Sequence, residues 1–264
     1  MSDEKKGTTY TNAVERAIDI LEFMAGCGRP VSVVEISKEF MVNRTSIYSI
    51  LKVLINKGYI RKIEEGRYAL TGRMFEYGQK FRNSFPVVHI ARAVAATFRS
   101  NYPCTMNIAM HFNGNNAILM NSINIAASES YRIDRSMASG QSVPLHATSL
   151  GKLLLAYMPP AESKEIIQHL DFQPYTEHTV KNYADLKKQM DFAVANGFVM
   201  EENEYYYNTF CVAAPIFDQT NNVVAACSLS YSTLFSNVDR EKVVMDVKYI
   251  AKNVSIGLGA TKRM

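Results

Sequence analysis

The stretch from Val31 to Lys62 reads VSVVEISKEFMVNRTSIYSILKVLINKGYIRK, and its spacing predicts a short helix, a turn and a longer helix. Ser32 stands three residues before Glu35, which is the pattern of a capping box at the start of a helix. Asn43 is a suitable cap for the longer helix, and Gly58 is a suitable end for it. The stretch therefore predicts a helix-turn-helix.

The longer helix separates its side chains by chemistry. At about 100° per residue, Ile47, Ile50, Leu51 and Leu54 share one face. The other side carries hydroxyl, amide and cationic groups without a carboxylate: Arg44, Thr45, Ser46, Tyr48, Ser49, Lys52 and Asn56. Such groups suit phosphate oxygens and base edges. This side is therefore our candidate for reading DNA.

The residues on either side complete a winged helix-turn-helix. AVERAIDILEFMA, residues 13–25, has the apolar stripe of an amphipathic helix. YIRKIEEGRYAL reads as two short strands around a Glu65-Gly66 turn, and it adds Arg61, Lys62 and Arg67 to the DNA-binding candidates. Three helices and a basic hairpin fit the major groove of double-stranded DNA. A winged helix that binds only another protein, with its polar face in water, is the alternative.

Composition limits the class of protein. The chain has 264 residues, of which 47% are hydrophobic and 20% charged, as in an ordinary globular protein. Its net charge of +4 permits a polyanionic partner without requiring one. We find no apolar run long enough to span a membrane and no secretory signal. Four cysteines without a CxxC pair fit a reducing compartment, so we expect a cytoplasmic protein.

The remaining sequence predicts a larger α+β domain. Strand patterns surround the turn at Asn113–Asn116, and two more, CVAAPIF and VVAACSLSYS, are joined by DQTNN. Helical patterns lie between them without a regular βαβ alternation, and a final helix is expected from about Asp239 to Val254. We expect a DNA-binding domain over 1–72, a linker helix over 73–86, and an effector-binding and oligomerisation domain over 87–264.

Both halves resemble one family, the IclR-type transcriptional regulators. VERAIDILEFMA, the opening stretch and GRYALTGRMFEYG are similar to its winged-helix domain and linker. SGQSVPLHATSLGKLLLAY, NGFVMEENE and CVAAPIFDQTNNVVAACSLS are similar to its effector domain. The resemblance implies a GAF-like effector domain, dimers or dimers of dimers, and an operator near a promoter. It also implies an effector among small organic acids, aromatic acids or related metabolites.

The resemblance implies an effector pocket built from the backbone of Ala147, Thr148 and Ser149 and from Glu201, Cys211, Ser228 and Ser230. Two patterns in the sequence support it. Ser228 and Ser230 alternate with apolar residues, so both hydroxyls share one face of a strand. The segment His146-Ala147-Thr148 sits where a helix begins, and free amides there favour an anion. Asn208, Glu201 and Ser49 stand where the family often has glycine, aspartate and arginine.

Cys211 admits other interpretations. A nucleophile with His146 as its base would make the protein a small-molecule hydrolase, although no third group orients the pair. A redox sensor would pair Cys211 with Cys227 across adjacent strands, and a purely structural thiol is a further alternative. The histidines show no metal-binding spacing, and HATSLGK lacks a phosphate-loop frame. We therefore expect no metal or cofactor, and we interpret Lys152 as a surface or packing lysine.

The sequence thus predicts a regulator whose operator binding responds to a small molecule, and not an enzyme. Met74 to Phe81 of the linker helix are expected to carry the response through a population shift. A sensor or interaction protein without DNA binding remains the competing class. The effector, the operator sequence and the direction of regulation are left open.

Overall fold

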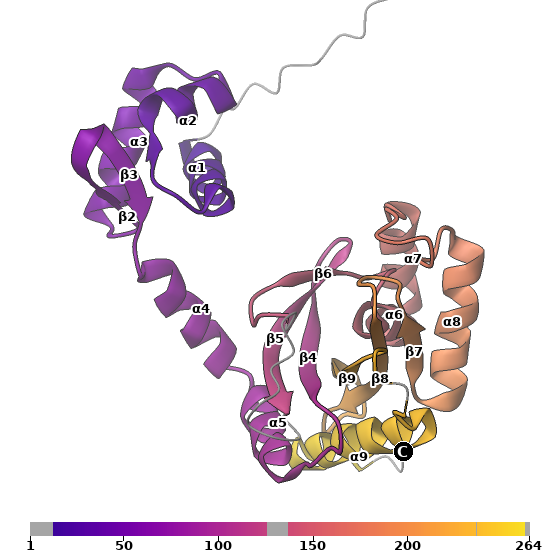
Figure 1. The fold of residues 1–264 in the computed structure, drawn as a ribbon. Coiled ribbons are helices and arrows are strands. Elements are labelled where there is room, and N and C mark those ends of the chain that lie inside the picture. The colour runs from indigo at the N-terminus through magenta and orange to yellow at the C-terminus, as the bar shows by residue number, and fades with distance from the viewer. Residues whose placement is uncertain (1–12, 126–136, 236, 262–264) are drawn as a thin grey trace, which may run out of the picture. The chain divides into compact units, whose positions relative to one another are not determined.

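The computed structural model describes residues 13–125, 137–235 and 237–261 (Figure 1). The chain divides into two compact units, residues 1–81 and 82–264. Unit 1 contains α1 (Ala13–Cys27), β1 (Val31–Ser32), α2 (Val33–Phe40), α3 (Arg44–Asn56), β2 (Ile60–Lys62) and β3 (Arg67–Leu70). Its three strands form an antiparallel sheet in the order β1-β3-β2. Three helices followed by this hairpin make the winged helix-turn-helix that the sequence predicts.

Local hydrogen bonds start the helices of unit 1 at the expected residues. The backbone N–H of Ser32 donates to Glu35 Oε2 over 2.8 Å, and Ser32 Oγ accepts from the Glu35 N–H, which completes the capping box of α2. Asn43 Oδ1 accepts from the Ser46 N–H over 2.8 Å at the start of α3. The apolar faces then meet in one core, which includes Ile20, Ile36, Ile47, Leu51, Leu54, Ile60 and Tyr68.

The helix α4 (Arg73–Asn83) follows the wing and contains no buried residue. Glu76 and Lys80 form an ion pair of 2.6 Å along its surface. The next helix, α5 (Pro86–Thr97), has Pro86 in its first turn, where the missing N–H of proline costs no helical hydrogen bond.

Unit 2 is built on a six-stranded antiparallel sheet in the order β6-β5-β4-β9-β8-β7. Its strands are β4 (Cys104–Asn113), β5 (Asn116–Ile125), β6 (Ser142–Pro144), β7 (Val199–Glu202), β8 (Thr209–Phe217) and β9 (Val223–Ser232). Its other helices are α6 (Ser149–Tyr157), α7 (Pro160–Gln168), α8 (Tyr183–Asn196) and α9 (Arg240–Gly257). This mixed arrangement confirms the α+β class (Figure 1).

Two cores lie on opposite faces of this sheet. One joins α5 and α9 to Met106, Ile108, Val212, Cys227 and Leu229, and the other joins α6 and α8 to alanines of β4, β8 and β9. The absence of a side chain at Gly151 lets α6 approach the backbone of Leu145 closely, because a Cβ on Gly151 would lie 2.4 Å from Leu145 Cα. Within the described ranges no helix combines the length and apolar character needed to cross a membrane.

Candidate functional site

The polar side of α3 faces away from the core of unit 1. Arg44, Thr45, Tyr48, Ser49, Lys52 and Asn56 are exposed, and Ser46 is half-buried. The buried Ile47, Leu51 and Leu54 fix the orientation of the helix, since they are the residues that pack against α1 and α2. The helix therefore presents two cations with hydroxyl groups between them, as its spacing predicts.

The three basic residues of the wing have different surroundings. Arg61 and Lys62 on β2 are exposed. Arg67 instead turns towards α2, where its Nη1 donates to the Pro30 carbonyl over 3.3 Å and lies 3.5 Å from Glu35 Oε2. Hydrogen bonds from Ser32, together with Arg29, lower the pKa of Glu35 to about 2, so this carboxylate is ionised at neutral pH. The exposed positive charge of the wing thus comes chiefly from β2.

In unit 2, polar residues line up across the sheet on the face towards α6. Strand register places Asn124, Thr105, Ser230, Cys211 and Glu201 in one row across β5, β4, β9, β8 and β7. The adjacent row contains Ser122, Asn107 and Ser228, and it continues into Ala213 and Val199 of the core around α6. The predicted Glu201, Cys211, Ser228 and Ser230 are thereby brought together.

Asn107 forms hydrogen bonds with residues of both rows. Its Nδ2 donates to Ser228 Oγ over 3.5 Å and to Ser230 Oγ over 3.4 Å, and its Oδ1 accepts from Ser122 Oγ over 2.8 Å. The Cys211 thiol donates to Ser230 Oγ over 3.1 Å. Thr105 and Asn107 were missed in the sequence, although the alternation in TMNIAM places both on one strand face.

The other predicted residues lie at the N-terminal end of α6, the helix that packs on β8 and β9. Thr148 caps it, because its Oγ1 accepts from the Gly151 N–H over 3.0 Å and donates to the Pro144 carbonyl over 2.9 Å. Ala147, Thr148 and Ser149 are buried. The first-turn N–H groups have no acceptor inside the helix and favour an anion. Among the described residues, no side-chain hydrogen bond joins these three to the rows on the sheet.

Lys152, which the sequence suggested to be a surface or packing lysine, does not lie at the surface. Its side chain has 0% exposure, and its Nζ donates to Glu204 Oε1 over 2.5 Å. Glu204 Oε2 accepts from the Val180 N–H over 3.2 Å, and the Glu204 N–H donates to Glu201 Oε2 over 3.1 Å. The buried ion pair of Lys152 and Glu204 is therefore hydrogen-bonded, through the Glu204 N–H, to Glu201 in the polar row.

The environment of Cys211 does not favour thiol chemistry. Burial, with the nearby Glu201 carboxyl, raises the pKa of Cys211 well above its usual value. His146 is buried with its Nε2 on the Gln173 carbonyl at 3.0 Å, and burial lowers its pKa. The alternative that pairs Cys211 with Cys227 is wrong, because Cys211 faces Ser230 while Cys227 faces Ala214, and the odd separation of Cys211 from Ala214 along β8 puts the two thiols on opposite faces.

Burial also acts on the carboxyl of Glu201. Its side chain is almost inaccessible, and this burial raises its pKa to about 7, against smaller lowering effects of Cys211 and Lys152. No cluster of three or more His, Cys, Asp or Glu suited to a metal ion occurs in the part of the chain that the structure describes. The site therefore offers hydroxyl, amide, thiol and carboxyl groups for binding a small polar molecule.

Two family models match the chain in order. The model of the IclR helix-turn-helix domain covers residues 13–64, and that of the C-terminal domain of IclR bacterial transcriptional regulators covers residues 83–256. The HTH-type transcriptional regulator KdgR of Dickeya chrysanthemi is 26% identical over 98% of this chain and 84% of its own. The HTH-type transcriptional repressor AllR of Klebsiella pneumoniae is 27% identical over 94% of this chain and 90% of its own.

Solved structures show the same architecture. The IclR protein of Thermotoga maritima superposes with a TM-score of 0.70 at 25% identity, over 94% of this chain and 99% of that one. An IclR homolog from Microbacterium hydrocarbonoxydans, crystallised with 4-hydroxybenzoate, has a TM-score of 0.73 at 17% identity, over 94% of this chain and 99% of its own.

The winged helix-turn-helix and the matched C-terminal regulator domain define a DNA-binding transcriptional regulator that responds to small-molecule effectors. Within that class, the chain belongs to the IclR family.

Proposed function

We propose that this regulator binds a double-stranded operator near a promoter and that an organic acid or related metabolite, bound on the α6 side of the sheet, modulates that binding. The observation that carries the proposal is the buried row of polar side chains from Thr105 to Glu201 across β4, β9, β8 and β7. A structural core has no need of these four neighbouring polar groups, since each costs free energy to bury.

The DNA contacts are assigned to α3 and the wing. The helix would contribute Arg44, Thr45, Ser46, Tyr48, Ser49 and Lys52, and the wing Arg61 and Lys62, with Arg67 near the backbone of Pro30. Arg44 and Lys52 contribute charge against phosphate, while the hydroxyl groups between them suit base edges.

The effector contacts are assigned to the backbone of Ala147, Thr148 and Ser149 and to the side chains of Glu201, Cys211, Ser228 and Ser230. Thr105 and Asn107 join this set because they lie in the same registered rows. The effector is bound and released without turnover, and this is supported by the raised pKa of the Cys211 thiol and by the engagement of His146 with Gln173. The protein acts in the cytoplasm, where its DNA lies, and uses no cofactor.

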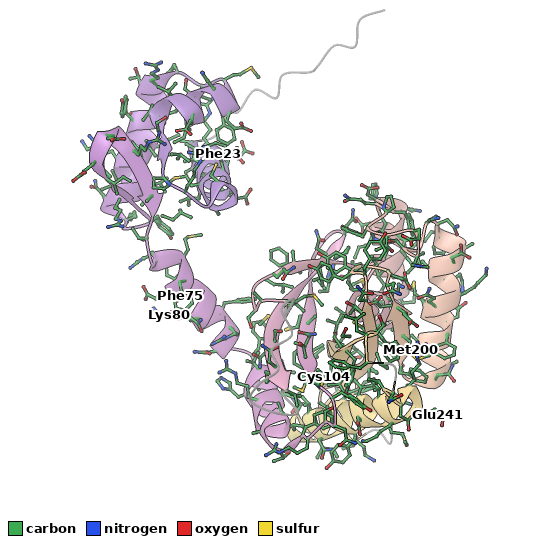
Figure 2. The ribbon with its side chains drawn as sticks, viewed as in Figure 1. Phe23, Phe75, Lys80, Cys104, Met200 and Glu241 are labelled. Carbon is green, nitrogen blue, oxygen red and sulfur yellow. The ribbon has the colours of Figure 1, made fainter. Side chains whose placement is uncertain are left out.

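We assign exposed apolar residues of α1 and α4 to contacts with a second copy of the chain. Phe75 projects from α4 with 70% exposure (Figure 2), and Met74 beside it and Ile18 on α1 are also exposed apolar residues. Paired helix-turn-helix units match two operator half-sites, so a homodimer or a dimer of dimers is expected. Residues 1–72 then bind DNA, 73–86 connect, and 87–264 bind the effector and assemble, while Ile18, Met74 and Phe75 would add contacts between copies in the first two segments. An effector that binds one arrangement more tightly shifts the population, and α4 transmits the change.

The experiment is a fluorescence anisotropy titration of the full chain with the intergenic DNA upstream of its own gene. We expect tighter binding to this fragment than to a scrambled one, and an affinity that falls steeply as salt increases. Equal binding to both fragments at every salt concentration would rule out a sequence-specific operator.

A further inference from the structure

The Lys152 ammonium has more hydrogen-bonding capacity than Glu204, its one hydrogen-bond partner among the described residues, uses. An ammonium group has three N–H donors, and Glu204 Oε1 takes one of them. The side chain has 0% exposure, so bulk water does not reach the other two. Donors at a buried charge are costly to leave unused, so the Lys152 ammonium is suited to bind an acceptor that a ligand brings.

The position of Lys152 connects it with the proposed effector site. Glu204 accepts from Lys152, and the N–H of Glu204 donates to Glu201, which faces Cys211 across β7 and β8. Lys152 also lies in the second turn of α6, next to the first-turn amides of Ser149 and Leu150. The charge of Lys152 acts on Glu201 and on Cys211. It lowers the pKa of each, although burial raises both pKa values by more.

A second buried side chain near this position has a nitrogen without a hydrogen-bond partner among the described residues. His146 Nδ1 has no hydrogen-bond partner among the described residues, while its Nε2 is 3.0 Å from the Gln173 carbonyl. The charge of Lys152 contributes to lowering the pKa of His146, after burial as the larger cause. His146 and Lys152 therefore lie within electrostatic range of each other, and both retain hydrogen-bonding capacity.

We propose that Lys152 is the residue that selects an anionic effector: its ammonium and the first-turn amides of α6 bind the carboxylate of the ligand. This inference rests on the effector site proposed above. Glu204 holds the lysine in place when the site is empty. The ammonium can donate to the carbonyl of a neutral ligand or to a carboxylate, but with the carboxylate both partners are charged, so an acid gains more than its amide.

The test compares five carboxylates with their own primary amides: acetate, lactate, gluconate, benzoate and 4-hydroxybenzoate. Calorimetry or thermal shift on the full chain gives the ratio of acid to amide affinity for each pair. In the wild-type protein at least one acid binds about tenfold or more better than its amide, the usual size of a charged hydrogen bond. If no acid exceeds its amide, the role of Lys152 is refuted.

Two variants assign the preference to Lys152. K152M/E204Q removes both charges with little change of shape, which proteins often tolerate, and its acid-to-amide ratio falls to about one. E204Q alone keeps the lysine charge, so the preference for the acid is retained or increased. An unchanged ratio in the double variant, or a lost preference in E204Q, overturns the inference. If K152M/E204Q does not fold, E204Q decides by itself.

The same titrations separate this inference from the proposed function. Amides that bind as well as acids and still change DNA binding leave the effector site standing and refute only the role of Lys152. If neither member of any pair binds, the proposal of a small-acid effector fails, and the role of Lys152 fails with it.

Discussion

The thiol of Cys211 donates a hydrogen bond to the hydroxyl of Ser230 over 3.1 Å, from β8 to the neighbouring strand β9. Ser230 in turn accepts from Asn107 on β4 over 3.4 Å. Cys211 is thus one member of a polar network that spans three strands. Its raised pKa does not suit a reactive role, since a nucleophilic thiol needs a lowered pKa, and we propose that it binds the effector.

The four cysteines are predicted to differ in their reaction with iodoacetamide. Cys27 is half-buried, while Cys104, Cys211 and Cys227 are buried, and burial raises the pKa of each of these three thiols. At pH 8 the native protein should therefore be alkylated first at Cys27, as shown by peptide mapping, and at all four sites after unfolding in urea. Alkylation of native Cys211 as fast as that of Cys27 would revive a catalytic or redox role.

Stability is predicted to depend on pH through Glu201. Burial raises its pKa from 4.5 to about 7, so the native state holds a proton between these values that the unfolded state releases. The stabilisation is complete below about pH 4.5 and is lost as the pH rises to about 7. Glu201→Gln, which stays neutral, should therefore gain stability relative to the wild type by roughly 3 kcal/mol between pH 4.5 and 8.

Urea denaturation of both proteins at pH 5 and pH 8, followed through unit 2, measures this difference. The other titrating groups contribute equally to the pH dependence of unfolding in both proteins, so their contributions cancel in the difference. A difference between the two proteins that is independent of pH would show that Glu201 has an ordinary pKa.

Removing charge from α3 is predicted to weaken DNA binding without unfolding the protein. Arg44 and Lys52 are exposed, so alanine at either position should leave the melting temperature unchanged. Each substitution should lower the slope of log affinity against log salt by about one. Lys188→Ala on α8 makes the same charge change in unit 2 and should leave DNA binding intact. Equal effects of all three would indicate nonspecific attraction only.

A methyl group at Gly151 is predicted to disrupt the packing of α6 against the backbone of Leu145. Its Cβ would lie 2.4 Å from Cα and 2.6 Å from O of Leu145, and backbone cannot move aside as a side chain can. Gly151→Ala should cost about 1–3 kcal/mol and abolish the response to effector. Gly26→Ala, where nothing lies within 4 Å, is the control and should be neutral or stabilising. An unperturbed Gly151→Ala protein would contradict the close packing of α6 on Leu145.

Much of the fold follows from local sequence. Ser32, Glu35 and Asn43 start helices through bonds to residues three positions away, and Gly197 ends α8 with a positive φ of 73°. Such signals are complete within a few residues, so the winged helix-turn-helix was predictable. Ser228 and Ser230 were predictable as a pair for the same reason, because strand alternation alone puts them on one face.

Other features depend on partners that are distant in sequence. The burial of Lys152 requires Glu204, which lies 52 residues later, and a lysine without that partner would belong at the surface. The alternative that pairs Cys211 with Cys227 is excluded only by the register of β8 and β9, which the intervening turn does not reveal. Arg67 looks like any other basic residue of the wing until the fold brings Glu35 next to it.

The central claim is that one chain couples a polar site on the sheet to DNA binding, and Ser228→Ala/Ser230→Ala tests it most directly. The measurement is the anisotropy of labelled promoter DNA, with and without the acid that binds the wild type most tightly. We expect the variant to bind DNA like the wild type but to lose the shift in affinity caused by the acid. A shift as large as that of the wild type would contradict the account.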